Sequence, residues 1–102
     1  MKEENSLITS LRRTLRSLAR ANQLEVFVFG SALRHSKPRD LDVAIKYRAS
    51  HHSLQDTVRI KDEVRQLVGE LDQDLPLDLY FLSDSELETD SFLARAKAHK
   101  IL

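Results

Sequence analysis

One stretch of this chain constrains its fold more than any other: an apolar segment that breaks sharply and is followed by paired aspartates. Residues 25–29 are rich in β-branched and aromatic side chains, which predicts a buried strand ending at Gly30-Ser31. Residues 40–47 alternate between polar and apolar side chains and predict a second strand. Because side chains alternate along a strand, Asp40 and Asp42 point from the same face, with Cα atoms about 6.6 Å apart.

The two aspartates predict a site for a divalent cation. Parallel carboxylates repel each other unless a cation lies between them, and hard oxygen ligands of this kind suit Mg²⁺. Gly30-Ser31 stands at a strand end, before a helical turn expected over residues 31–36. Backbone N–H groups in such a turn favour an anion, and the serine hydroxyl can add a donor. A phosphate and a metal ion would therefore meet at one edge of the sheet.

The remaining pattern predicts an α/β (α+β) domain. Apolar residues recur at helical spacing over residues 6–21 and 54–71, and residues 76–82 predict a third strand. Ser83 and Glu86 match a capping box that opens a final helix, which is expected to run through Phe92 towards His99 near its end. The connection between the first two strands is too short for a parallel crossover, so this pair should be antiparallel. We expect a small mixed three-stranded sheet flanked by helices.

The third strand supplies another carboxylate. Leu77, Leu79 and Phe81 alternate with Asp78, which places Asp78 on the polar face of the sheet, where it can join the first two aspartates. An exposed Asp78 with Lys46 as its cross-strand partner is the structural alternative.

Taken singly, the other residues also have structural explanations. Gly30 could be a turn glycine and Ser31 a helix N-cap. Asp40 could simply begin a strand, and Asp42 could face solvent beside a lysine. The interpretation as a metal and phosphate site depends on these residues occurring together, with the aspartates on the same face of their strands.

Length, charge and composition limit the remaining possibilities. A chain of 102 residues is expected to form one domain over residues 1–102, and its 16 basic and 16 acidic residues cancel, so no overall field calls for nucleic acid. Binding of nucleic acid through the arginine-rich first helix remains an alternative. The chain has no cysteine, and its longest apolar run, Val26 to Phe29, is too short to cross a bilayer. Glu3 and Glu4 stand where a signal peptide would be basic, so we expect a cytoplasmic location.

Together these motifs resemble the DNA polymerase β-like nucleotidyltransferase superfamily, and within it the minimal nucleotidyltransferase branch. The family pattern is an apolar strand, Gly-Ser, a short helical segment, Asp-x-Asp on the next strand and a later lone aspartate in an apolar strand. Over about residues 24–82 this chain supplies Gly30-Ser31, Arg34, Asp40-Leu41-Asp42 and Leu77-Asp78-Leu79. The loop before Asp40 is shorter than in many relatives, and Arg39 replaces a small polar residue; Arg39 could clamp a phosphate or pair with an aspartate.

The resemblance implies a polymerase β palm-like fold and a nucleotidyl transfer that uses two Mg²⁺ ions and ATP. In that family pattern, the first two aspartates hold Mg²⁺ against the triphosphate. The third completes the second metal site and helps to deprotonate the attacking hydroxyl. The implied catalytic and metal-binding residues are Asp40, Asp42 and Asp78, and the implied phosphate contacts are Gly30, Ser31 and Arg34.

The resemblance also implies a partner. Members of this branch commonly occur beside a helical protein of the HEPN family (higher eukaryotes and prokaryotes nucleotide-binding) in toxin–antitoxin pairs. The chain is thus expected to be an antitoxin that transfers AMP from ATP to a tyrosine hydroxyl of its toxin partner, with Phe92 and Leu93 as exposed candidate contacts. The alternative is a catalytically silent antitoxin or assembly subunit that neutralises its partner by stoichiometric binding. Assembly of this chain into a homo-oligomer is a further alternative.

Overall fold

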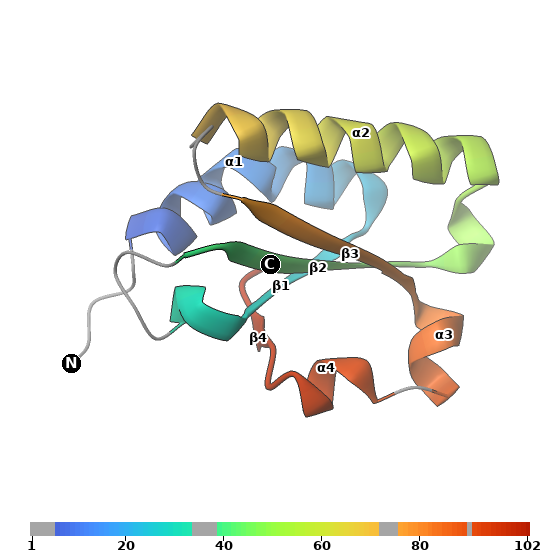
Figure 1. The fold of residues 1–102 in the computed structure, drawn as a ribbon. Helices are drawn as coiled ribbons and strands as arrows, with labels where there is room; N and C mark the ends of the chain where they lie inside the picture. Colours follow the sequence, from blue (N-terminus) through green and yellow to red (C-terminus); the bar gives the residue numbers. More distant parts are fainter. Residues whose placement is uncertain (1–5, 34–38, 72–75, 90) are drawn as a thin grey trace.

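The structure, a computed structural model, describes residues 6–33, 39–71, 76–89 and 91–102. Three longer strands and two long helices form most of it, and short helical turns connect them (Figure 1). In chain order the elements are α1 (Ser6–Asn22), β1 (Glu25–Phe29), η1 (Gly30–Leu33), β2 (Leu41–Tyr47), η2 (Ala49–His51), α2 (Leu54–Leu71), β3 (Leu77–Ser83), α3 (Asp84–Thr89), α4 (Phe92–Arg95) and β4 (His99–Lys100).

The sheet is mixed, with strand order β3-β2-β1-β4. β1 pairs antiparallel with both β2 and β4, whereas β2 and β3 are parallel. This agrees with the expected antiparallel arrangement of the first two strands. The parallel pair is possible because α2 provides the crossover that returns the chain to the starting edge.

The predicted strand number and final helix were wrong. The sheet has four strands, because His99 and Lys100 form β4 opposite Val28 and Phe27 of β1. The segment expected to be one helix is divided into α3 and α4, and His99 belongs to a strand instead of a helix end. A two-residue polar strand carries no periodicity of its own. It forms because the outer edge of β1 offers hydrogen-bonding groups, as in the 2.8 Å bond from the Ile101 N–H to the Val26 carbonyl.

The hydrophobic core lies between the sheet and the two long helices, which cover the same face (Figure 1). Alternate residues of β1 and β2 enter it, as period-two patterning predicts. The largest fully buried side chains are Leu11, Leu15, Val26, Val28, Leu41, Val43, Ile45, Ile60 and Val64. Phe81 of β3 packs at the margin of this core, with its ring stacked on Tyr47 at a centroid distance of 4.7 Å.

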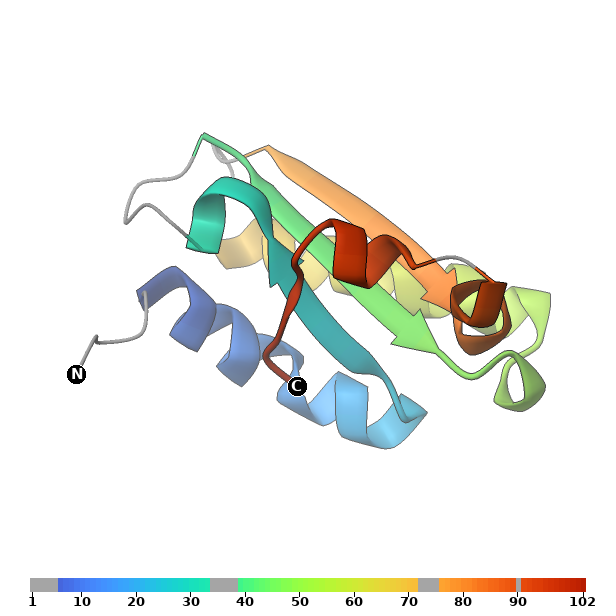
Figure 2. The same cartoon turned by 90° about the horizontal axis from the view of Figure 1, so that it is seen from below.

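The opposite face of the sheet holds a small aromatic cluster formed by Phe29, Tyr80 and Phe92. The Phe92 ring of α4 lies 5.6 Å from the Phe29 ring and 5.2 Å from the Tyr80 ring. The Phe92 ring is therefore half-buried against its own sheet. Leu93 is also half-buried, and the prediction that both residues are exposed was wrong. This packing holds α4 beneath the sheet, as the view from below shows (Figure 2).

Reciprocal side-chain caps begin two of the helices. The predicted capping box is confirmed: the Glu86 N–H donates to Ser83 Oγ at 3.1 Å, and Ser83 N–H donates back to the Glu86 carboxylate at 3.4 Å. At the start of α2, Asp56 N–H and Ser53 N–H each donate to the other residue's side chain at 3.1 Å. None of the helices in the described ranges has the length and apolar character needed to cross a bilayer.

Candidate metal centre

Three carboxylates converge where β2 and β3 begin. Asp40 lies just before β2, Asp42 is the second residue of β2, and Asp78 is the second residue of β3. The parallel register sets Asp42 directly beside Asp78. One carboxylate oxygen from each of the three residues lies within 4.8 Å of the others. The structure thus brings together the three aspartates that the sequence predicts on one face.

The closeness of this cluster helps to explain why residue 30 is a glycine. Its backbone φ is +75°, in the left-handed region that favours glycine, and it begins η1 immediately after β1. A Cβ at this position would overlap Oδ2 of Asp42. Gly30 is therefore required twice, by its backbone conformation and by the close approach of the Asp42 carboxylate.

Ser31 orients the first aspartate. Its hydroxyl donates to Oδ1 of Asp40 at 3.2 Å and lies 3.4 Å from the Asp40 backbone carbonyl. The sequence predicts that Ser31 donates to a phosphate, and in this structure the hydroxyl instead ties η1 to the start of β2. Because a hydroxyl can rotate, the Ser31 hydroxyl can donate either to Asp40 or to a bound phosphate.

The surroundings of Asp42 disfavour the ionised form of its carboxyl. Its partial burial is the largest cause that raises the pKa of its carboxyl above the ordinary value of 3.8, and the charges of Asp40 and Asp78 raise it further. A hydrogen bond with Asp78 acts in the same direction. A bound cation would oppose these effects, because it favours the ionised form of the Asp42 carboxyl.

The donor set fits a hard divalent cation. Mg²⁺ binds carboxylate oxygens at 2.0–2.1 Å, so two oxygens on opposite sides of one ion are about 4.2 Å apart. Three oxygens within 4.8 Å of one another are close enough to converge on one ion or on two ions that share carboxylates. Asp40, Asp42 and Asp78 are the residues that could hold such ions.

The remaining predicted residues divide into three cases. Arg34 lies outside the described residues, so its expected phosphate contact stays a prediction. Arg39 is exposed, next to Asp40. Lys46 lies opposite Leu82 in the β2–β3 register, and its ammonium is 4.0 Å from the Glu25 carboxylate, which argues against the alternative in which it pairs with Asp78.

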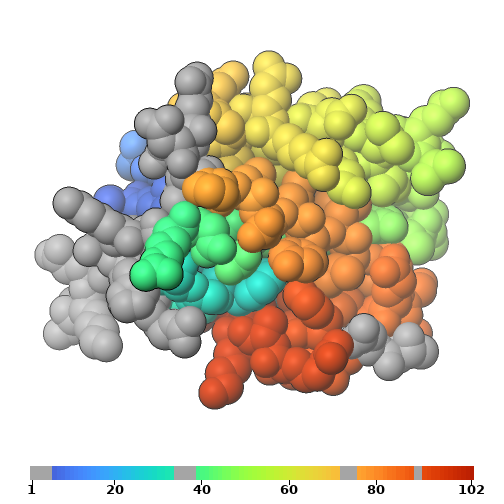
Figure 3. Space-filling model, viewed as in Figure 1, coloured from blue at the N-terminus to red at the C-terminus, as the bar shows by residue number. Residues whose placement is uncertain are grey.

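A pocket beside the cluster includes a residue that the sequence does not single out. It has a volume of about 240 Å³ and is lined by Gly30, Leu33, Ala96 and Lys97. It therefore shares Gly30 with the acidic cluster. In the space-filling view, η1 and the start of β2 reach the surface between β3 and α4 (Figure 3). No local pattern marks Lys97, because only the folded chain brings the turn after α4 to η1.

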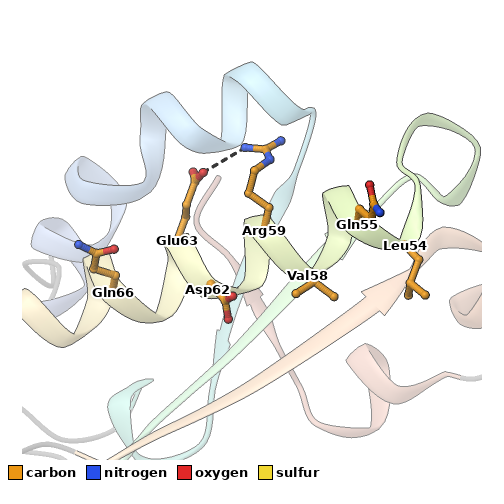
Figure 4. Close-up of a pocket in the computed structure, with 7 residues that line it drawn as sticks. All are labelled: Leu54, Gln55, Val58, Arg59, Asp62, Glu63 and Gln66. Carbon is orange, nitrogen blue, oxygen red and sulfur yellow. Dashed lines mark hydrogen bonds and ion pairs between the residues drawn. The ribbon is translucent and has the colours of Figure 1, made fainter.

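A second hollow lies on the helical layer of the molecule. It has a volume of about 580 Å³ and is lined by residues of α2 alone: Leu54, Gln55, Val58, Arg59, Asp62, Glu63 and Gln66. Leu54, Val58 and Asp62 project from one side of the helix, while Arg59 and Glu63 project from another and form a 3.0 Å ion pair (Figure 4). Since α2 packs on the core face, this hollow is separated from the carboxylates by the sheet.

No family model, curated protein or solved structure matches this chain.

Proposed function

We propose that this chain is a Mg²⁺-dependent nucleotidyltransferase that transfers AMP from ATP to a hydroxyl group of a partner protein. One observation carries the proposal: the oxygens of Asp40, Asp42 and Asp78 lie within 4.8 Å of one another, beside the left-handed turn at Gly30. Carboxylates at this spacing are suited to divalent cations, and a tight turn at the end of a strand is a common place for phosphates to bind.

Each residue would have a separate task. Bound divalent cations would neutralise the charge that develops on phosphate oxygens during the transfer. Asp40 and Asp42 would hold the cation, with Ser31 fixing the orientation of Asp40 through its 3.2 Å hydrogen bond. Asp78 is the most exposed of the three aspartates, so it can accept the proton of an incoming hydroxyl. Gly30 leaves room for the Asp42 carboxylate to lie against the turn that would receive the phosphates.

The acceptor is proposed from the family resemblance. It points to a tyrosine hydroxyl on a HEPN-family toxin, with the chain acting as its antitoxin by modifying it. The position of Asp78 supports an acceptor on another chain, because β3 is an edge strand of the sheet and Asp78 is exposed there. A second protein can therefore reach this carboxylate without displacing the core.

The test is transfer of label from ATP to whatever small helical protein is found to be encoded beside this chain. ATP labelled at the α-phosphate should label that neighbour in the presence of Mg²⁺, whereas ATP labelled at the γ-phosphate should not. Asp42→Asn should abolish transfer while the two proteins still bind. The matched control is Asp62→Asn, which removes an exposed carboxylate from α2 on the other side of the sheet and should leave transfer intact.

Two outcomes would contradict the proposal. Absence of label under conditions where the pair binds would favour neutralisation by stoichiometric binding, and neutralisation of the partner would then survive Asp42→Asn. Equal labelling from the α- and γ-phosphates would point to a different transfer chemistry.

A further inference from the structure

The turn after α4 has an unusual residue at its centre. Lys97 has a backbone φ of +53°, in the left-handed region. Its N–H donates to the Ala94 carbonyl at 3.1 Å, and the Ala98 N–H donates to the Leu93 carbonyl at 2.9 Å. These two bonds form a Schellman motif, whose left-handed position is usually glycine because a Cβ is disfavoured there. The chain therefore places a lysine at a position where glycine would be more stable.

The location of this strained residue points to a function. Lys97 lines the pocket of about 240 Å³ together with Gly30, and a Cβ at Gly30 would overlap the Asp42 carboxylate. Among the described residues that line the pocket, Lys97 has the cationic side chain. Both ribbon views show the turn after α4 lying beside η1 (Figures 1 and 2). Strained backbone is typical of functional sites, where surrounding packing maintains it.

The aromatic cluster provides that packing. Phe92, five residues before Lys97, holds α4 against the sheet through the rings of Phe29 and Tyr80. On the other side of the turn, β4 pairs with β1 through His99 and Lys100. The turn is thus held at both ends, which fixes its position relative to η1.

We propose that this pocket receives the terminal phosphates of the nucleoside triphosphate and that Lys97 binds them as they leave as pyrophosphate. This role rests on the proposed function. In the transfer, the acceptor oxygen forms a bond to the α-phosphorus, its proton passes to Asp78, and the bond from the α-phosphorus to the bridging oxygen breaks. Pyrophosphate departs with that electron pair. An ammonium group is a compact charge that can offset the charge gained by the leaving group.

The test measures calorimetric binding of inorganic pyrophosphate, ATP and AMP in the presence of Mg²⁺. Lys97→Gly should unfold at a higher temperature than the parent, because glycine relieves the strain, yet bind pyrophosphate and ATP about tenfold more weakly. Its affinity for AMP should change little, and Lys97→Arg should keep most of the pyrophosphate affinity. Higher stability combined with weaker binding excludes misfolding as the cause.

Gln23→Gly is the matched control. Gln23 follows α1 with φ +54°, and the Leu24 N–H donates to the Ala19 carbonyl at 2.9 Å, so its backbone strain resembles that of Lys97. The variant should also gain stability but should bind pyrophosphate like the parent.

The outcomes separate this inference from the proposed function. If Lys97→Gly binds pyrophosphate and ATP as tightly as the parent, while Asp42→Asn still abolishes transfer of label, the role of Lys97 is overturned and the proposed function stands. If the parent chain binds neither Mn²⁺ nor ATP with Mg²⁺, both are overturned. Equal weakening of AMP and pyrophosphate binding would also overturn the assignment of Lys97 to the terminal phosphates.

Discussion

Gly30 connects the backbone of the sheet to the acidic cluster. The chain leaves β1 there with a positive φ, and the Asp42 carboxylate occupies the space in which a side chain would otherwise lie. The two requirements have different consequences. The backbone conformation affects stability, whereas the close approach affects the position of a carboxylate at the end of a flexible side chain.

Substitution of Gly30 should therefore affect metal binding more than folding. Gly30→Ala should lower the free energy of unfolding by about 1–2 kcal/mol, the cost of a left-handed alanine. It should also rotate the Asp42 carboxylate and weaken Mn²⁺ binding, which electron paramagnetic resonance can measure. Gly69→Ala is the control, because Gly69 lies in α2 with open space around it and alanine there should stabilise the helix by about 0.5–1 kcal/mol. Full Mn²⁺ affinity in Gly30→Ala would contradict the expected displacement of the Asp42 carboxylate.

The C-terminal segment shows how an element can depend on the rest of the fold. β4 has two residues, but the residues after it are tied firmly to the molecule. Ile101 is only 6% exposed and its N–H bonds to Val26, while its carbonyl accepts from Arg12 Nε at 2.9 Å. The final residues thus link β1 to α1, and in doing so they hold the Lys97 turn near η1.

Ile101 should accordingly contribute to global stability. Ile101→Ala should lower the free energy of unfolding by about 2–4 kcal/mol, because a buried aliphatic side chain is removed from the core. Leu54→Ala, at a position 81% exposed, should change it by less than about 0.5 kcal/mol. Urea denaturation of the two variants checks this difference. Similar effects of the two substitutions would mean that the C-terminal segment is not packed as described.

The two faces of the sheet serve different purposes in the molecule as a whole. One face is covered by α1 and α2 and supplies most of the hydrophobic stabilisation. The other holds three like charges in one small region, which opposes folding in the absence of a cation. Stability and the proposed activity are therefore in conflict at Asp42, as is common at functional sites.

This conflict predicts a specific pH dependence. The pKa of Asp42 is raised by burial and by its neighbours, so just above pH 3.8 the folded state binds more protons at this group than the unfolded state does. The contribution of Asp42 to the free energy of unfolding therefore falls as the pH rises through that window, and the loss persists at neutral pH. Asp42→Asn should raise the metal-free stability at neutral pH by about 0.5–2 kcal/mol.

Magnesium should make the parent chain more stable than Asp42→Asn, which reverses their order of stability without the metal. At a free concentration 100 times the dissociation constant it should stabilise the parent by about 2.7 kcal/mol, with little effect on Asp42→Asn. Urea denaturation of both proteins at several pH values, with and without Mg²⁺, measures these differences. Comparing the parent with Asp42→Asn separates the effect of Asp42 from the effects of Asp56 and Asp84, which both proteins share. Backbone hydrogen bonds lower the pKa values of Asp56 and Asp84, so their contributions to the free energy of unfolding change with pH in the opposite direction. An unchanged metal-free stability in Asp42→Asn would contradict the strain assigned to this carboxylate.

Local patterns in the chain accounted for the long elements and for the phase of the acidic residues. The predicted bounds of α2 and β1 agree with the structure, and so does the capping box at Ser83, because periodicity and capping depend on neighbours in sequence. The common face of Asp42 and Asp78 also follows from alternation, once the two strands pair. The short strand β4 and the burial of Phe92 had no comparable local signal.

Contacts between segments distant in the sequence determine which residues surround the carboxylates. Alternation of side chains is a local property, so the amino-acid order is enough to put the carboxylates on the polar face of their strands. Which residues surround them is a long-range property. Lys97 and Gly30 line one pocket because the aromatic cluster and the pairing of β4 with β1 fold the last part of the chain back under the sheet. The ring contact of Phe92 with Phe29 and the β4–β1 pairing join residues far apart in the sequence.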